Sequence, residues 1–176
     1  MNRRIAIQRI SMMLGGMIST PLMAGIMQER LNFGPSLEIS LNQEKLLAEV
    51  ADVIIPTTTT PGAKAAGAEK FIVRVIRDCY ELPEQEKFYQ GLDNLENRAK
   101  ASYNKSFVDL TPEQKHGVVL KTTSEDKPFF MQMKGLTVTA YFTSEVGATE
   151  ALDYLPIPGR FDGSWTMPKG QKTWAL

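Results

Sequence analysis

The sequence predicts an all-α fold, a bundle of about five helices with an extended C-terminal tail rich in aromatic residues and proline. Apolar residues recur every three to four positions through most of residues 40–143, which is the period of a helix with one buried face. Residues that favour helix starts precede several of these segments. The period disappears in the last part of the chain. We therefore expect a helical domain over residues 40–176 that includes an extended tail over residues 153–176.

The first helix is expected to begin after Ser40. Gln43 stands three residues further on, as the second member of a capping box. The apolar face of this helix is formed by Leu46, Leu47, Val50, Val53 and Ile54. The helix is expected to end before Pro56, and the Thr-rich run over residues 57–62 is typical of a loop.

A second helix is expected over residues 65–80. Phe71, Val75 and Cys79 recur at i, i+4 and i+8, with Ile72 and Ile76 beside them, so Cys79 is predicted to lie on the buried stripe. A reactive thiol needs an exposed, electropositive setting. We therefore predict that this cysteine packs in the core and has no catalytic role.

Prolines mark the starts of the next two helices. Pro83 is tolerated in the first turn of a third helix that runs to about residue 103. Thr111, Pro112 and Gln114 combine an N-cap, a proline at the first helical position and the glutamine of a capping box. The sequence therefore predicts a fourth helix that begins at residue 112.

A fifth helix is expected to open at Pro128 and to continue to about residue 143. Its inward-facing residues are predicted to be Phe129, Met133, Leu136 and Ala140. A short helical turn over residues 149–152 is expected before the tail.

The tail combines large aromatic residues with prolines and shows neither a helical nor an alternating period. Disordered tails are depleted in large aromatic side chains, so this one is expected to lie against a surface. Two interpretations stay open: the tail wraps its own helical body, or it lies on a partner, where Trp, Tyr and Arg are over-represented. The candidate partner-contact residues, which include the turn before the tail, are Ser144, Glu145, Tyr154, Pro156, Pro158, Arg160, Phe161, Trp165 and Trp174.

Composition narrows the possible functions. The 176 residues carry 20 basic and 20 acidic side chains, so no net field attracts nucleic acid and we expect no nucleic-acid partner. Cys79 is the only cysteine and His116 the only histidine. An internal disulfide and a Cys-rich metal or iron–sulfur site are therefore excluded. We expect no catalytic residue, metal or cofactor in this chain.

The N-terminal segment reads as an export signal. Arg3 and Arg4 are adjacent, and residues 10–27 include no charged side chain. Paired arginines before a weakly apolar, Gly-containing stretch are typical of the twin-arginine route. We expect residues 1–27 to be the signal and residues 28–39 a linker, which places the domain in the periplasm. The alternative is that the segment is not cleaved and anchors the protein in a membrane.

Familiar nucleotide-binding and hydrolase motifs are absent. No GxGxxG follows a strand, and neither GxxxxGKS nor GxSxG occurs. Aspartate and glutamate are plentiful, so a pair of carboxylates that act as acid and base stays an alternative.

Four stretches of the chain carry a resemblance to a known family. They are LAEVADVIIP at residues 47–56, TPGAKAAG at 60–67, FTSEVGATE at 142–150 and YLPIPGRFDG at 154–163. In combination they resemble the gluconate 2-dehydrogenase subunit 3 family, and the resemblance extends from about residue 40 to the C-terminus.

This resemblance implies a non-catalytic accessory subunit of a periplasmic dehydrogenase that oxidises sugars or sugar acids. Such subunits work beside a larger flavoprotein of the glucose–methanol–choline (GMC) type, which holds FAD, and a cytochrome c subunit with haem often takes the electrons. The small subunit holds no cofactor and helps the large one to fold, assemble and pass through the twin-arginine translocation machinery. Two alternatives remain: a free-standing periplasmic carbohydrate-active enzyme that uses carboxylates, and a membrane-anchored periplasmic binding module.

Overall fold

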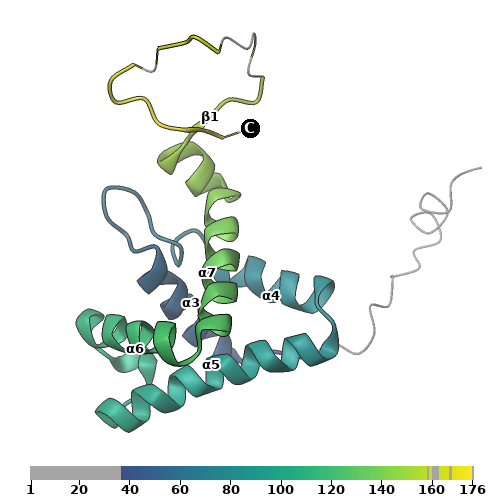
Figure 1. Cartoon of the computed structure of the whole chain (residues 1–176), viewed down its shortest axis with the longest axis vertical. Coiled ribbons are helices and arrows are strands. Elements are labelled where there is room, and N and C mark those ends of the chain that lie inside the picture. The colour runs from purple at the N-terminus through teal and green to yellow at the C-terminus, as the bar shows by residue number, and fades with distance from the viewer. Residues whose placement is uncertain (1–36, 158, 160–162, 167, 176) are drawn as a thin grey trace, which may run out of the picture. The chain divides into compact units, whose positions relative to one another are not determined.

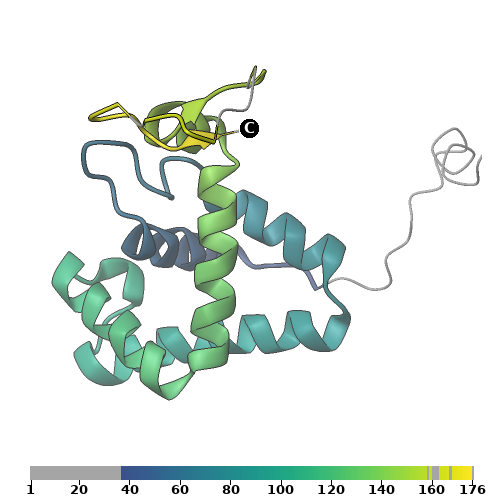
Figure 2. The same cartoon turned by 45° about the horizontal axis from the view of Figure 1, so that its top comes forward.

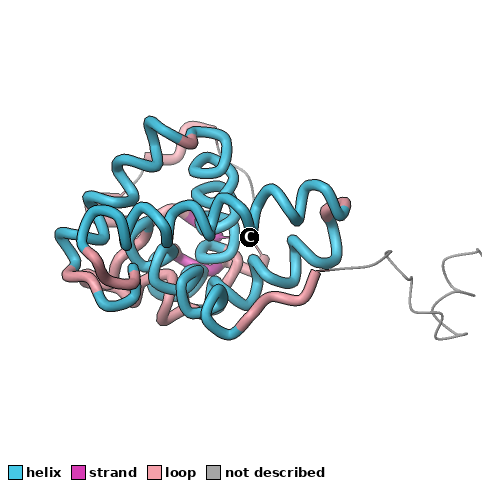
Figure 3. The backbone as a smooth tube through the Cα atoms, turned by 90° about the horizontal axis from the view of Figure 1, so that it is seen from below, coloured by secondary structure: helices cyan, strands magenta, loops and turns pink. Residues whose placement is uncertain are grey.

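The computed structural model describes residues 37–157, 159, 163–166 and 168–175, all within the unit Ser36–Leu176. These residues confirm the all-α fold. They form five α-helices (Figure 1): α3 (Leu41–Ile54), α4 (Ala68–Cys79), α5 (Leu82–Tyr103), α6 (Pro112–Glu125) and α7 (Lys127–Phe142). The short elements are a 3-10 helix η1 (Phe107–Asp109), a π-helix η2 (Gly147–Ala151) and the strands β1 (Asp153–Tyr154) and β2 (Trp174–Ala175). Figure 3 shows that the two strands make up only a small part of the described chain.

The predicted export signal over residues 1–27, with Arg3 and Arg4, lies outside the described residues. Most of the predicted linker over residues 28–39 also lies outside the described residues, which begin at residue 37. Within the described part of the chain, no helix combines the length and the apolar character that crossing a membrane requires.

Local sequence signals set the helix starts. The Ser40 hydroxyl oxygen accepts a hydrogen bond from the backbone N–H of Gln43 at 3.2 Å, and the Gln43 side chain accepts one from the backbone N–H of Ser40, also at 3.2 Å. Thr111 and Gln114 form the same reciprocal pair at the start of α6. Both predicted capping boxes are confirmed, because they depend only on residues three positions apart.

Helix α4 begins later than predicted and buries a narrower face than predicted. Gly67 adopts a left-handed conformation with φ of 69°, so the regular helix starts only after it. Helices α3 and α7 pack against this helix. The residues it buries are Ala68, Ile72 and Ile76. Ile72 and Ile76 belong to the predicted stripe, whereas Phe71 and Val75 are only half-buried. Cys79 is exposed at the end of the helix, so the prediction that it packs in the core is wrong.

Helix α7 is the central element of the bundle. It contacts α3, α4, α5 and α6, and Figure 2 shows it, in green, crossing the other helices. Its buried residues are Phe129, Met133, Thr137, Ala140 and Tyr141. Three of the four predicted inward residues are therefore buried, and Leu136 is half-buried. At the N-terminal end of α7 the Phe129 ring packs on Phe88 of α5, with the ring centroids 5.6 Å apart.

A charged cluster ties three segments together on the flank of α3. Glu49 pairs with Lys115 of α6 at 2.7 Å and with Lys64 of the turn before α4 at 2.5 Å. The side chains of Glu49 and Lys115 are only 15% and 14% exposed. Burial acts to raise the pKa of Glu49, but the hydrogen bonds and charges of Lys115 and Lys64 together outweigh it, so its pKa lies below the ordinary value.

We expect Glu49→Gln to lower the free energy of unfolding at neutral pH by about 1–2 kcal/mol, between the values typical of exposed and of buried pairs. Because folding lowers the pKa of Glu49, the stabilisation is present above the ordinary glutamate pKa and is lost as the pH falls through the folded value. Urea unfolding over a range of acidic pH values checks this: the wild type and the variant should converge as the pH falls. An exposed glutamate of α5, replaced in Glu86→Gln, is the control, and an equal loss in both variants at every pH would contradict the prediction.

Candidate partner-binding site

The candidate partner-contact residues lie where α7 ends and the chain passes through η2 into the tail. Figure 2 shows this end of the molecule, with the tail in yellow-green beyond the upper end of α7. The described members of the set are Ser144, Glu145, Tyr154, Pro156, Trp165 and Trp174. Pro158, Arg160 and Phe161 lie outside the described residues.

A tight turn connects α7 to η2. The Ser144 hydroxyl donates to the carbonyl oxygen of Tyr141 at 2.6 Å and accepts from the backbone N–H of Gly147 at 3.0 Å. Gly147 is buried, and a Cβ at this position would lie 1.9 Å from the same carbonyl oxygen. Ser144 therefore shapes the turn with its hydroxyl, whereas the neighbouring Glu145 is exposed and free to meet a partner.

Tyr141 joins this turn to the Thr-rich turn that follows α3. Its ring is buried, and its hydroxyl donates to the carbonyl oxygen of Pro61 at 2.8 Å. Gly62 allows the Thr-rich turn to close, because a Cβ there would lie 2.5 Å from the backbone nitrogen of Thr57. Two stretches separated by 80 positions in the sequence are therefore neighbours at this end of the bundle.

The tail closes into a loop. Strands β1 and β2 pair in parallel. The backbone N–H of Asp153 donates to the carbonyl oxygen of Thr173 at 3.0 Å, and that of Leu155 donates to the carbonyl oxygen of Ala175 at 2.9 Å. We call residues 153–175 the clasped loop, and Figure 1 shows its two ends meeting at β1, beyond the end of α7. The sequence predicted an extended tail but not the pairing of its ends.

Large apolar side chains are exposed at this end. Their exposed fractions are 39% for Phe142, 54% for Tyr154, 81% for Ile157, 62% for Trp165 and 47% for Trp174. Single exposed apolar residues are ordinary, but a concentration of them marks interaction sites. These exposures favour the interpretation in which the tail lies on a partner.

Two of these exposed residues were missed in the sequence. Phe142 directly follows the buried Tyr141 at the end of α7, so the helical period turns it outward. Ile157 lies between two prolines, where neither a helix nor a central strand can bury it. Both local patterns are present in the sequence, but they predict an exposed side chain only when the residue at which α7 ends is known.

The two residues most suited to metal or thiol chemistry do not form a site. Cys79 is exposed on α4, and His116 is exposed on α6. Among the described residues, no group of three or more His, Cys, Asp or Glu side chains is arranged to hold a metal ion.

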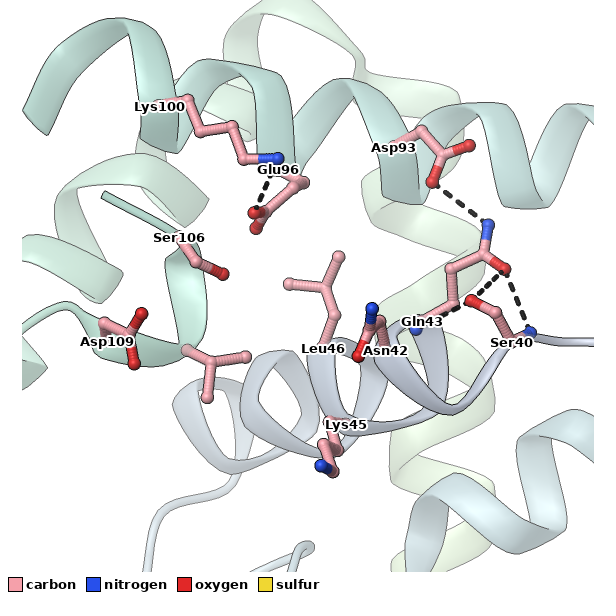
Figure 4. Close-up of a pocket in the computed structure, with 11 residues that line it drawn as sticks. Ser40, Asn42, Gln43, Lys45, Leu46, Asp93, Glu96, Lys100, Ser106 and Asp109 are labelled. Atoms are coloured by element: carbon pink, nitrogen blue, oxygen red, sulfur yellow. Dashed lines mark hydrogen bonds and ion pairs between the residues drawn. The ribbon is translucent and has the colours of Figure 1, made fainter. Parts of the chain in front are cut away.

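A polar cleft of about 600 Å³ lies between α3, α5 and η1. Figure 4 shows three carboxylates among its lining residues, Asp93, Glu96 and Asp109. Such a cleft is what a carboxylate-based enzyme would require. In Figure 4, however, Asp93 accepts a hydrogen bond from the Gln43 side chain at 3.0 Å and Glu96 pairs with Lys100 at 3.2 Å.

Glu96 is held as a structural carboxylate. Burial acts to raise its pKa, but the backbone N–H of Phe107, the Ser106 hydroxyl and Lys100 lower it by more, so the pKa lies below its usual value. The Phe107 N–H donates to Glu96 at 3.0 Å and so fixes η1 on α5. A general acid in a glycosidase needs a raised pKa. Glu96 is therefore not suited to the role of such a general acid.

The chain matches a known protein family. The family model described as gluconate 2-dehydrogenase subunit 3 matches residues 42–159 of the chain. The match begins one residue inside α3, includes the other four α-helices and the first part of the clasped loop, and ends before Trp165 and Trp174. No curated protein and no solved structure shows significant similarity to the chain.

Proposed function

The chain belongs to the gluconate 2-dehydrogenase subunit 3 family, and on this premise we propose that it is the non-catalytic small subunit of a periplasmic sugar or sugar-acid dehydrogenase. The family is one subunit of a multi-subunit enzyme, so partner subunits are implied. The match over residues 42–159 is the observation that carries the proposal.

The proposed main partner is a GMC-type flavoprotein that holds FAD and performs the oxidation. A cytochrome c subunit, with haem, would pass the electrons on. The chemistry of the small chain supports this division of labour, because its single cysteine and single histidine are exposed on different helices. Its largely buried Glu49–Lys115 pair joins α3 to α6.

The proposed partner surface is the end of the bundle formed by the 144–147 turn and the clasped loop. Interfaces are enriched in aromatic side chains, and the exposed residues of this end include two tryptophans. The turn and the loop start from α7, which is packed on all four other α-helices described. The proposed partner surface is therefore attached directly to the helix that packs against the rest of the core.

The proposed second role is to assist the flavoprotein in folding, assembly and export. The twin-arginine pair Arg3 and Arg4 supports this role, since this signal is read by a dedicated receptor route and would carry a bound partner along. A large subunit without a signal of its own would then depend on this chain to reach the periplasm.

Co-expression of the full chain with the GMC-type subunit tests the proposal. We expect the two proteins to co-purify from the periplasmic fraction. With the variant Arg3→Lys/Arg4→Lys we expect the complex to form but to stay in the cytoplasm, because only the signal is changed. The readout is the amount of both proteins in each fraction.

Two outcomes would contradict the proposal. A chain that never co-purifies with a flavoprotein would refute the subunit role. A flavoprotein that reaches the periplasm equally well without this chain, or with the double-lysine variant, would refute the export role alone. Deletion of the GMC-type subunit is the matched control, and the small chain should then be exported by itself.

A further inference from the structure

A buried glutamine fastens the segment before α3 to the rest of the domain. Gln85 lies in the first turn of α5 and is 3% exposed. Its amide nitrogen donates to the carbonyl oxygens of Tyr80 at 2.9 Å and Arg77 at 3.4 Å, where α4 ends. Its amide oxygen accepts from the backbone N–H of Leu37 at 3.0 Å, 48 positions away in the sequence. One side chain therefore joins three segments.

We call residues 37–39 the strap. Leu37 and Ile39 are half-buried and pack against the hydrophobic core, whereas Glu38 between them is exposed. Figure 2 shows the start of the described chain, in purple, between α4 and α5. The strap is therefore held by apolar contacts on both sides of an exposed glutamate and by the hydrogen bond to Gln85.

A second hydrogen bond holds the chain just after the strap. The Gln43 side chain, in the first turn of α3, donates to Asp93 of α5 at 3.0 Å. Gln85 and Asp93 are separated by about 12 Å along the helix, at the usual rise per residue. The chain therefore runs into α3 along α5 between two fixed points.

We infer that the strap shields the junction between the predicted export signal and the folded domain from proteolysis. The shielding is a property of this chain alone and needs no large subunit, so the inference goes beyond the proposed function. Its value for the proposed export role is that signal and domain stay on one polypeptide while a partner is bound.

Shielding follows from what a protease must do to cut at this point. Exposed segments that lack packing and hydrogen bonds are the preferred sites of cleavage. Glu38 is exposed, but Leu37 and Ile39 have to leave the core before the backbone between them is accessible. The rate of cleavage after Glu38 therefore follows the fraction of molecules in which the strap is open.

The strap lies away from the proposed partner surface. Gln85 precedes Phe88 by three positions, and the Phe88 ring packs on Phe129 in the first turn of α7. The 144–147 turn follows the other end of α7, a helix of 16 residues and so about 24 Å long. Figure 1 shows α5 and the clasped loop at opposite ends of this helix. A large subunit on the proposed surface would leave the strap uncovered, so the domain itself must shield the junction.

The test is limited proteolysis of the full chain with an enzyme that cuts after glutamate. Product masses identify the cut after Glu38. Gln85→Leu removes the acceptor of the Leu37 N–H and leaves the sequence around Glu38 unchanged. It should speed this cut about tenfold, the change in open population expected for one lost hydrogen bond. Gln90→Leu replaces an exposed glutamine of the same helix and should leave the rate unchanged.

A second pair of variants keeps the test valid if circular dichroism melting shows that Gln85→Leu does not fold. Leu37→Pro removes the N–H donor and leaves the bonds between Gln85 and α4 in place, whereas Leu37→Ala keeps the donor. Each rate is divided by that of a peptide of residues 34–43 with the same substitution, because the change adjoins the cleaved bond. The corrected rate should be higher for the proline variant than for the alanine variant.

The outcomes separate this inference from the proposed function. Equal rates after Glu38 in the wild type, Gln85→Leu and Leu37→Pro would refute the strap, as would a wild-type chain cut as fast as the peptide. A large subunit that slows the cut in the wild type would show that the partner shields the junction, which also refutes the inference. If no large subunit binds the chain at all, the proposed function fails while the rates of the free chain still decide on the strap.

Discussion

Replacing Gly147 by alanine is expected to destabilise the domain by about 3 kcal/mol, at the upper end of what one added methyl group costs. A Cβ at this position would lie 1.9 Å from the carbonyl oxygen of Tyr141 and 3.1 Å from the Cα of Phe142. Both are backbone atoms of α7, so no rotation of a side chain can relieve the clash. The joint between α7 and η2 would have to open.

The same helix offers a matched control. Gly135 lies on the exposed side of α7, and a Cβ built there would have no atom within 4 Å apart from its chain neighbours and the backbone of its own helix. Gly135→Ala should therefore raise stability by about 0.5–1 kcal/mol, since alanine is the better helix former. Urea unfolding followed by circular dichroism measures both variants. If Gly147→Ala were as stable as the wild type, the close contact between Gly147 and the backbone of α7 would not be essential, which would contradict the prediction.

This joint also matters for the proposed function. The clasped loop follows η2 directly, so a displaced joint would move the loop as well. Gly147→Ala should then weaken complex formation even where the variant is still folded. Ser144 supports the same joint through its hydrogen bonds to Tyr141 and Gly147.

Truncation of Phe88 is expected to be the most damaging change in the core. Its side chain is 1% exposed and packs between Phe129 of α7 and the neighbouring Tyr89, with centroids 5.6 and 5.7 Å away. Phe88→Ala should cost about 3–5 kcal/mol, the range for a large aromatic replaced in a packed core. Since whole domains are stable by only about 5–15 kcal/mol, much of the fold's stability would be lost.

The crossing of α5 and α7 leaves little room to compensate for this loss. Gly91 already lies so close that a Cβ there would be 2.3 Å from the Phe129 ring, which means that the two helices are in direct contact. The midpoint of urea unfolding should fall markedly in Phe88→Ala and stay within error in the control Leu120→Ala, which replaces an exposed side chain of α6. A loss below about 1.5 kcal/mol would indicate that the crossing repacks, contrary to this account.

Where one turn of helix contains all the information, prediction from the sequence succeeded. Ser40 with Gln43 and Thr111 with Gln114 are pairs three residues apart, and both form the expected capping boxes. The inward face of α7 was also predicted largely correctly. Its period is long and regular, and a helix packed on several others must bury one such face.

Prediction failed where the decision depended on neighbours from elsewhere in the chain. The predicted apolar stripe of α4 is wider than the face that packs against α3 and α7, and Cys79 lies outside that buried face. The hydrogen bond from Tyr141 to Pro61 joins residues 80 positions apart, and no local sequence pattern predicts it.

The sequence alone determined that this protein is a helical domain, that it lacks the cysteines and histidines of common redox and metal sites, and that it belongs to a family of dehydrogenase subunits. Only the tertiary structure decided which residues of the tail face outward and that its ends are joined at β1 and β2. The reason is physical: caps and periods act through neighbours within one helical turn. A clasp between residues 153 and 174 depends on where α7 and η2 direct the chain.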